Sequence, residues 1–174
     1  MAIEISIEDA QIRQIEKTLA SLKPASVSKA VQQASSRAVD HAKKVGWDKV
    51  KSLYTAKQKD VYANISKRRE NDGTVMVIRG APMGVEHYKA RKTKKRGVFV
   101  TIKRANTFNV SKGFAYNKTF FQRHGKSRFP IDRLFGPAAP QLFGNPETMS
   151  AMEKAGMETY EKRLMHELDR LIGN

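Results

Sequence analysis

The chain has 174 residues, 40% of them hydrophobic, and a formal net charge of +16. This length and composition suit a single domain, and the absence of cysteine excludes a disulfide scaffold, a cysteine nucleophile and a thiolate metal site. The start of the chain lacks the basic and apolar regions of an export signal, and no apolar run approaches the roughly 18 residues of a spanning helix, so we expect cytoplasmic synthesis and no membrane partner.

Two helices are predicted before residue 54. Residues 3–7 alternate apolar and polar side chains as a short strand would, and Ser6 with Asp9 forms a capping box for a first helix that ends at Pro24. Ser26 is expected to cap the second helix. The apolar face of this second helix has small residues as far as Gly46 and larger ones beyond it: Val27, Val31, Ala34, Ala38, Ala42, Val45, Trp47, Val50 and Leu53.

Strands are predicted in the middle of the chain. A capping box at Thr55 and Gln58 first indicates a short helix, and Asn71-Asp72-Gly73 then supplies a hairpin turn before a β-rich run at 74–78. Alternation predicts three further strands, at 85–90, 98–103 and 114–121. We therefore expect a mostly antiparallel twisted sheet of about four or five strands.

The last third combines a loop and a helix. Pro and Gly interrupt regular structure across residues 122–145, but this segment is too apolar for a solvated linker, so we expect an extended loop packed on a surface. Within it, Asp132 is expected to form an ion pair that fixes the loop. Asn145 and Pro146 begin an amphipathic C-terminal helix over 146–172, whose methionines fit core packing better than a partner groove. Its methionines are Met149, Met152, Met157 and Met165.

Together these elements predict one α+β domain over residues 1–174. Residues 1–65 are mainly helical, 66–121 form the sheet, 122–145 form the extended loop and 146–172 form the C-terminal helix. The N-terminal helices and the long C-terminal helix are expected to flank the sheet.

The positive charge is concentrated in residues 88–133, which we call the basic block. Its 46 residues contain fourteen Lys and Arg and one acid, so fourteen minus one, or thirteen, of the sixteen net charges lie there. Alternating apolar residues and aromatics are interleaved with these charges, a pattern that a disordered basic tail lacks. The basic block is therefore expected to be folded and to face a polyanion, an acidic protein or other copies of the chain.

No pattern in the sequence indicates catalysis. The Gly-rich segment 79–84 lacks the Lys and Ser/Thr of a P-loop, and Asp132 is the one acid of the basic block, so paired carboxylates for hydrolysis are missing there. We expect no enzymatic activity, no cofactor and no metal. The histidines, which have no metal-ligand spacing and are expected at surface or cap positions, are His41, His87, His124 and His166.

The order of these features resembles one known family. The chain runs through an Ala- and Val-faced helix, a hairpin, the stretch Lys89 to Val98, a basic Phe-rich strand pair, the stretch Arg128 to Pro137 and a terminal helix. From roughly Ser26 to the C-terminus this order resembles the prophage minor tail protein Z family. The turn at 96–98 is the second most specific part of the likeness. The most specific part is a loop that contains Pro130, Ile131, Gly136, Pro137, Pro140, Gln141 and Leu142.

The resemblance implies a structural virion protein and no enzyme. Members are tail completion components of lambda-like long-tailed phages, which finish the head-proximal end of the tail and make it competent for head-tail joining. The expected partners are copies of the chain in a hexameric ring, tail terminator or tail tube proteins, the head-tail connector and genomic DNA held without sequence specificity. The expected location is the virion tail, after assembly in the host cytoplasm.

Two sets of residues are candidates for contact with partners. The basic set, expected to face protein or DNA, is Lys89, Arg91, Lys92, Lys94, Lys95, Arg96, Lys103, Arg104, Arg123, Lys126 and Arg128. The expected interface loop is Phe129, Pro130, Ile131, Asp132, Leu134, Phe135, Gly136, Pro137, Pro140 and Leu142.

An alternative function is nonspecific nucleic-acid binding by the sheet surface of residues 88–133. Lys and Arg supply the sequence-independent part of such binding, and Phe114, Tyr116 and Phe120 at alternating strand positions could stack on bases. The sequence leaves open whether the basic block faces DNA or protein.

Overall fold

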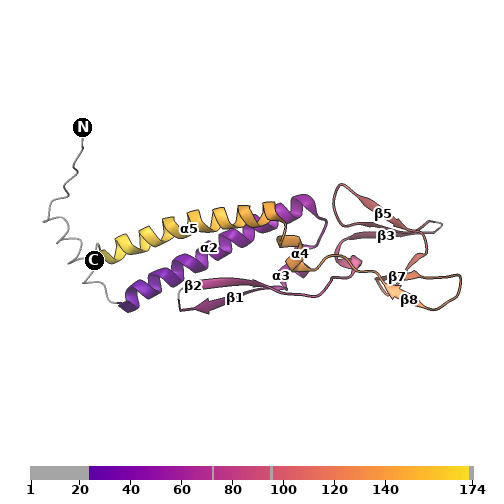
Figure 1. Ribbon diagram of the computed structural model, residues 1–174, viewed down its shortest axis with the longest axis horizontal. Helices are drawn as coiled ribbons and strands as arrows, with labels where there is room; N and C mark the ends of the chain where they lie inside the picture. Colours follow the sequence, from indigo (N-terminus) through magenta and orange to yellow (C-terminus); the bar gives the residue numbers. More distant parts are fainter. Residues whose placement is uncertain (1–23, 72, 95, 173–174) are drawn as a thin grey trace, which may run out of the picture.

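The computed structural model describes residues 24–71, 73–94 and 96–172. The predicted strand at 3–7 and the predicted first helix lie outside these residues. Two long helices lie side by side at one end of an elongated molecule, and most of the strands lie at the other end (Figure 1). The predicted α+β class is confirmed.

In chain order the elements are α2 (Pro24–Leu53), α3 (Gln58–Tyr62), β1 (Ile65–Glu70), β2 (Gly73–Ile78), the 3-10 turn η1 (Val85–His87), β3 (Lys89–Thr93), β4 (Gly97–Thr101), β5 (Thr107–Val110), β6 (Gly113–Tyr116), β7 (Thr119–Arg123), β8 (Ile131–Arg133), α4 (Ala139–Phe143) and α5 (Pro146–Ile172).

The helical half of the molecule has three layers, with α2 between α5 and the β1–β2 hairpin (Figure 1). The predicted face of small residues allows the two helices to pack closely. Ala34 and Ala38 are buried, and a Cβ added at Gly156 of α5 would lie 3.5 Å from the Cβ of Ala42. Ser26 lies within α2, which the structure describes from Pro24 onward, so the predicted cap at Ser26 is wrong.

The second predicted capping box is also wrong. The residue that precedes α3 is Lys57, and its side chain makes no capping hydrogen bond. The Thr55 hydroxyl instead donates to the carbonyl of Thr101 on β4, and the Thr55 N–H donates to the carbonyl of Ile102 at 2.9 Å. Thr55 therefore ties the end of the helical half to the sheets.

The hairpin predicted at Asn71-Asp72-Gly73 is confirmed. Strands β1 and β2 pair antiparallel from Ile65 opposite Ile78 to Glu70 opposite Gly73. Gly73 has a φ of +144°, a conformation that favours glycine.

The remaining strands form two further small sheets, so the prediction of a single sheet is wrong. One has the order β3-β4-β5 and the other β6-β7-β8, and all their pairings are antiparallel. The strand predicted at 85–90 begins only at Lys89, after η1. The single strand predicted at 114–121 is a hairpin that turns at Asn117 and Lys118, which have φ values of 45° and 64°. Strand β5 was not predicted.

The segment 122–145 packs on the molecule as expected, but it is not wholly irregular. It contains β8 and the short helix α4. Its Gly136 N–H donates to the carbonyl of Met83 at 2.7 Å, and Leu142 is fully buried. Asn145 caps α5 as predicted, since its side-chain oxygen accepts from the N–H of Glu147 at 3.1 Å.

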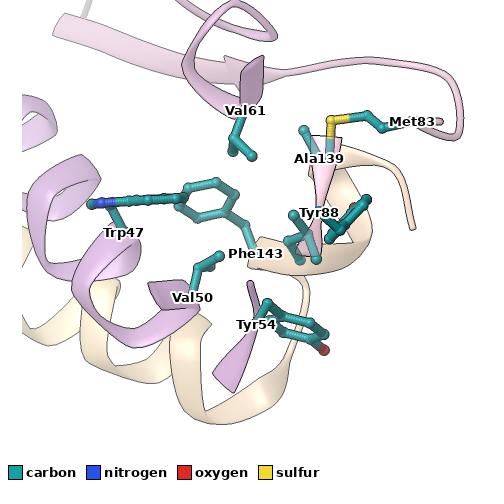
Figure 2. Close-up of a cluster of buried hydrophobic side chains, with 9 residues drawn as sticks. Trp47, Val50, Tyr54, Val61, Met83, Tyr88, Ala139 and Phe143 are labelled. Atoms are coloured by element: carbon teal, nitrogen blue, oxygen red, sulfur yellow. The ribbon is translucent and has the colours of Figure 1, made fainter. Parts of the chain in front are cut away.

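A cluster of buried side chains joins the two halves (Figure 2). Phe143 of α4 lies beside Trp47 and Val50 of α2, with Val61 of α3 on the other side of its ring. The cluster consists of Trp47, Val50, Tyr54, Val61, Met83, Tyr88, Ala139, Leu142 and Phe143. Because its members come from α2, α3, the segment 83–88 and α4, the predicted extended loop contributes directly to the core.

Helix α5 leaves most of its methionines uncovered. Met152 packs against the central cluster, whereas Met149, Met157 and Met165 are 48%, 61% and 60% exposed. Core packing therefore accounts for one of the four. In the described part of the chain, no helix combines the length and apolar character needed to cross a membrane.

Candidate functional site: an arginine and aromatic surface

The two small sheets pack their inner faces against each other. Val98 and Val100 of β4 are buried there with Val85, and Phe120 of β7 packs against them. The three aromatics predicted to stack on bases, Phe114, Tyr116 and Phe120, therefore do not share one face. Phe120 is a core residue, because the turn at 117–118 places it on the opposite face of the sheet from Phe114.

The outer face of the β6-β7-β8 sheet gathers aromatic and arginine side chains. The register places Phe114 opposite Phe121 and Phe121 opposite Arg133, and alternate residues along a strand share a face. We call this surface the Arg–aromatic face. Its members are Phe114, Tyr116, Phe121, Arg123, Ile131 and Arg133, together with Phe135 beside Arg133.

The side chains of this face are arranged as stacked pairs. The rings of Phe114 and Phe121 have centroids 5.7 Å apart at an interplanar angle of 25°. The guanidinium of Arg123 lies 4.6 Å from the centroid of Phe114, and that of Arg133 lies 5.2 Å from Phe135. Such cation–π contacts hold the arginines over the rings while the charge stays accessible. Tyr116 and Phe135 are 67% and 54% exposed, so the surface is apolar as well as positive.

One acid borders this face. Glu86 of η1 forms an ion pair and a hydrogen bond with Arg133. Burial acts to raise the pKa of Glu86, but the hydrogen bond from Arg133, backbone hydrogen bonding and the charges of Arg133 and His87 outweigh it, so the pKa lies below its ordinary value. Glu86 therefore remains ionised and orients Arg133, while Arg123 forms no ion pair with a carboxylate of the described residues.

Asp132 is hydrogen-bonded to His124, a contact that becomes an ion pair only when the histidine is protonated, and among the described residues it pairs with neither of the neighbouring arginines Arg128 and Arg133. The two residues stand at the ends of the β7–β8 connection, so the pair closes the base of that loop. Both side chains are largely exposed, which limits the contribution of the pair to stability.

The described charges of the basic block are all exposed, but they do not form one surface. Lys89 and Arg91 lie on the outer face of β3, where the Arg91 guanidinium is 5.3 Å from the Phe99 centroid, and Lys92 lies on the other face. Arg104 is tied to the helical half, because its Nε donates to the carbonyl of Lys51 at 2.7 Å. Of the remaining predicted residues, Lys94 and Arg96 flank the β3–β4 turn, Lys103 follows β4, and Lys126 and Arg128 lie in the β7–β8 connection. Lys95 lies outside the described residues.

The predicted interface loop is divided between surface and core. Phe129 is 64% exposed, and Pro130 and Asp132 are also exposed, whereas Leu134 packs against the inner cluster of the two sheets. Leu142 is buried, and Ile131, Gly136, Pro137 and Pro140 are half-buried.

The Gly136-Pro137 part of the loop covers Tyr88. The Tyr88 hydroxyl donates to the carbonyl of Pro137 at 2.6 Å, and a Cβ on Gly136 would lie 2.7 Å from the Tyr88 ring. Burial, and to a smaller extent the nearby Tyr54, raises the pKa of Tyr88 well above its ordinary value. In this part of the loop, the residues most specific to the family resemblance hold the core together.

Sequence reasoning missed Phe121 and Arg133 as members of a site. The one local sign of the turn that pairs Phe114 with Phe121 is Asn117, a residue type that tolerates a positive φ, but the following Lys118 stands where such turns usually have glycine.

The structure also bears on metal binding. Among residues 24–71, 73–94 and 96–172, no three His, Asp or Glu side chains converge as metal ligands. His87 bonds to Asp60 at 2.7 Å and His41 to Thr159 at 2.8 Å, so both have local partners.

Comparisons with protein-family models, with curated proteins and with solved structures find no match to this chain.

Proposed function

We propose that this protein is a structural virion component that completes the head-proximal end of a phage tail and makes it competent for head-tail joining. The resemblance of residue order to the minor tail protein Z family supports this function. The observation that carries it is the uncovered Arg–aromatic face, since arginine and aromatic residues dominate the binding energy of protein interfaces.

The partner of this face is a second copy of the chain. The exposed side of α5 offers the complementary chemistry, with carboxylates for the arginines and methionines for the aromatic rings. Its residues are Met157, Glu158, Glu161, Met165 and Asp169. Since the two faces differ, the contact is head-to-tail, and such a contact closes into a ring when the rotation between copies permits. The hexameric ring implied by the resemblance is a closed form of this contact.

Variants of the two faces test the contact. Arg123→Glu should abolish self-association through the Arg–aromatic face, and Glu158→Lys with Glu161→Lys should abolish it through α5. Mixed together, the two variants should form only a dimer, because each retains one intact face. Sedimentation velocity measures these states, and Arg91→Glu on the other sheet is the matched control. If Arg123→Glu and Arg91→Glu sediment alike, the Arg–aromatic face is not the interface.

The tail function has its own assay. Tails assembled without this protein are mixed with purified chain and with heads, and joined particles are counted by electron microscopy. Addition of the wild-type chain should restore joining, and Arg123→Glu should not. No increase in joined particles with the wild-type chain would overturn the proposed function.

Nucleic-acid binding by the sheet surface is a second candidate because Tyr116, 67% exposed, shares a sheet face with Arg123 and Arg133. A stacked base contributes about 1–3 kcal/mol. If Tyr116 stacks on bases, Tyr116→Ala should weaken binding of a single-stranded oligonucleotide about tenfold or more at physiological salt. Unchanged affinity would remove this candidate.

A further inference from the structure

A second basic surface lies on the helical half, outside the basic block. A groove of about 570 Å³ runs between α2 and α5. Helix α2 contributes residues at i, i+3, i+4 and i+7, which spans one side of the helix, and α5 contributes a cluster from its middle. The lining residues are Arg37, Asp40, His41, Lys44, Thr159, Lys162 and Arg163.

The positive charge of this groove is not neutralised by the protein. Asp40 is its one acid, and Asp40 forms an ion pair with Lys67 of β1. Within the described residues, none of the four Lys and Arg side chains of the groove forms an ion pair with a carboxylate. His41 is engaged with α5, because its Nδ1 lies 2.8 Å from the Thr159 hydroxyl. The groove therefore presents four uncompensated cations on two helices that are fastened together.

The basic surface continues into a neighbouring groove. This second groove, about 310 Å³, shares Arg37 with the first and is lined otherwise by Lys29, Gln32, Gln33, Ser36 and Arg69. From Lys29 to Lys44 along α2 the distance is about 22 Å at 1.5 Å per residue. Strand β1 and helix α5 lie on either side of α2 (Figure 1). Because Arg69 belongs to β1 and Arg163 to α5, the residues that line the two grooves come from all three layers of the helical half.

The chemistry of these two grooves differs from that of the Arg–aromatic face. Every lining residue is polar or charged, with no Phe, Tyr or Trp to stack on a base and no apolar anchor for a protein; the one aromatic ring is the imidazole of His41, which is hydrogen-bonded to Thr159. Arg, Lys, Gln, Ser and Thr are the side chains that contact phosphate oxygens. A length of about 22 Å matches roughly six phosphates of one strand at 3.4 Å per phosphate, more than a small anion would occupy.

We propose that the two grooves along α2 form one site that binds the sugar-phosphate backbone of duplex nucleic acid without sequence specificity. A duplex keeps its bases stacked inside and presents its phosphates, which fits a surface that has cations and hydrogen-bond donors but no Phe, Tyr or Trp. This site shares no residue with the Arg–aromatic face or with its proposed counterpart on α5, although Lys162 and Arg163 adjoin Glu158 and Glu161 of that counterpart, so the proposal does not rest on the self-association proposed above.

The test compares two variants of equal charge. The groove variant carries Arg37→Gln, Lys44→Gln, Lys162→Gln and Arg163→Gln. The control variant neutralises four exposed lysines of the helical half that line neither groove: Lys49, Lys51, Lys59 and Lys154. Fluorescence anisotropy measures the affinity of each for a labelled DNA duplex of about 20 base pairs over a series of salt concentrations.

The slope of log affinity against log salt reports the number of phosphates contacted, at about 0.9 per contact. The groove variant should reduce the slope by about 3 to 4, and the control variant by less than about 1. Equal slopes for the two variants would overturn the proposal. The proposal would also be overturned if the groove variant no longer bound polyglutamate while its slope for DNA was unchanged, because the grooves would then bind acidic protein.

Thermal unfolding of both variants checks the fold. If the fourfold groove variant lacks a cooperative transition, two double variants give the same comparison. The groove double variant is Arg37→Gln with Arg163→Gln, and its control is Lys49→Gln with Lys59→Gln. The groove double variant should then reduce the slope by about 2. Arg123→Glu serves as a further control. It should reduce self-association while the slope falls by no more than about 1, which separates the failure of one proposal from that of the other.

Discussion

Replacement of Gly136 by alanine sets two effects against each other. Gly136 does not adopt a positive φ, so alanine fits its backbone and would stabilise the protein by about 0.4–1 kcal/mol through the unfolded state. The added Cβ, however, would lie 2.7 Å from one ring carbon of Tyr88 and 3.2 Å from two others. Tyr88 is 3% exposed and its hydroxyl is bonded to Pro137, so the ring cannot move aside freely. Overpacking of this kind costs about 1–3 kcal/mol.

The overpacking therefore exceeds the gain, and Gly136→Ala should destabilise the protein by about 1–2 kcal/mol. For a chain of this length the midpoint of thermal unfolding should fall by about 2–8 °C. Gly125→Ala is the matched control, because the nearest atom to its added Cβ is 3.9 Å away, and it should be neutral or slightly stabilising. The pair Gly136→Ala with Tyr88→Leu should show little further loss beyond Tyr88→Leu alone. If Gly136→Ala is as stable as Gly125→Ala, the loop does not press on Tyr88 as described.

Three further substitutions test the core and its borders. Leu142→Ala removes a fully buried side chain and should lower the free energy of unfolding by about 2–5 kcal/mol in urea titration, whereas a loss below 1 kcal/mol would show that α4 is not part of the core. Tyr88→Phe should cost about 1 kcal/mol at neutral pH. Because burial raises the pKa of Tyr88 in the folded protein, the contribution of Tyr88 to the free energy of unfolding is complete below pH 10.0 and is lost as the pH rises above that value. Tyr88→Phe should therefore lose less stability than the wild type when unfolding is measured at increasingly alkaline pH. Arg133→Gln should raise the pKa of Glu86 in a carboxyl NMR titration, and an unchanged pKa would contradict the ion pair.

The long helices and the first hairpin could be predicted because their signals are local. The small-residue period of α2 and the cap at Asn145 describe contacts made within one element or its neighbour. The hairpin at 114–121 could not, since Lys118 adopts a positive φ without the glycine that marks such turns. Because the chain reverses at this turn, Phe120 points to the inner face of the sheet, and Phe121 lies on the Arg–aromatic face with Phe114.

The basic grooves along α2 could not be read from the sequence for a different reason. Arg69, Arg37 and Arg163 belong to β1, α2 and α5 and are far apart in the chain, so no window of sequence shows their combined charge. The basic block dominated the sequence because its charges are contiguous. In the folded chain they are dispersed over two sheets and the connections between them.

The charge of a surface therefore does not by itself identify the partner. The Arg–aromatic face places each guanidinium on a ring, which suits a protein surface with carboxylates and methionines. The grooves along α2 place similar cations among amides and hydroxyls, which suits phosphate. The Arg–aromatic face and the grooves lie on different halves of an elongated molecule (Figure 1), but the α5 residues proposed to receive that face from another copy, such as Glu158 and Glu161, adjoin Lys162 and Arg163 of the groove.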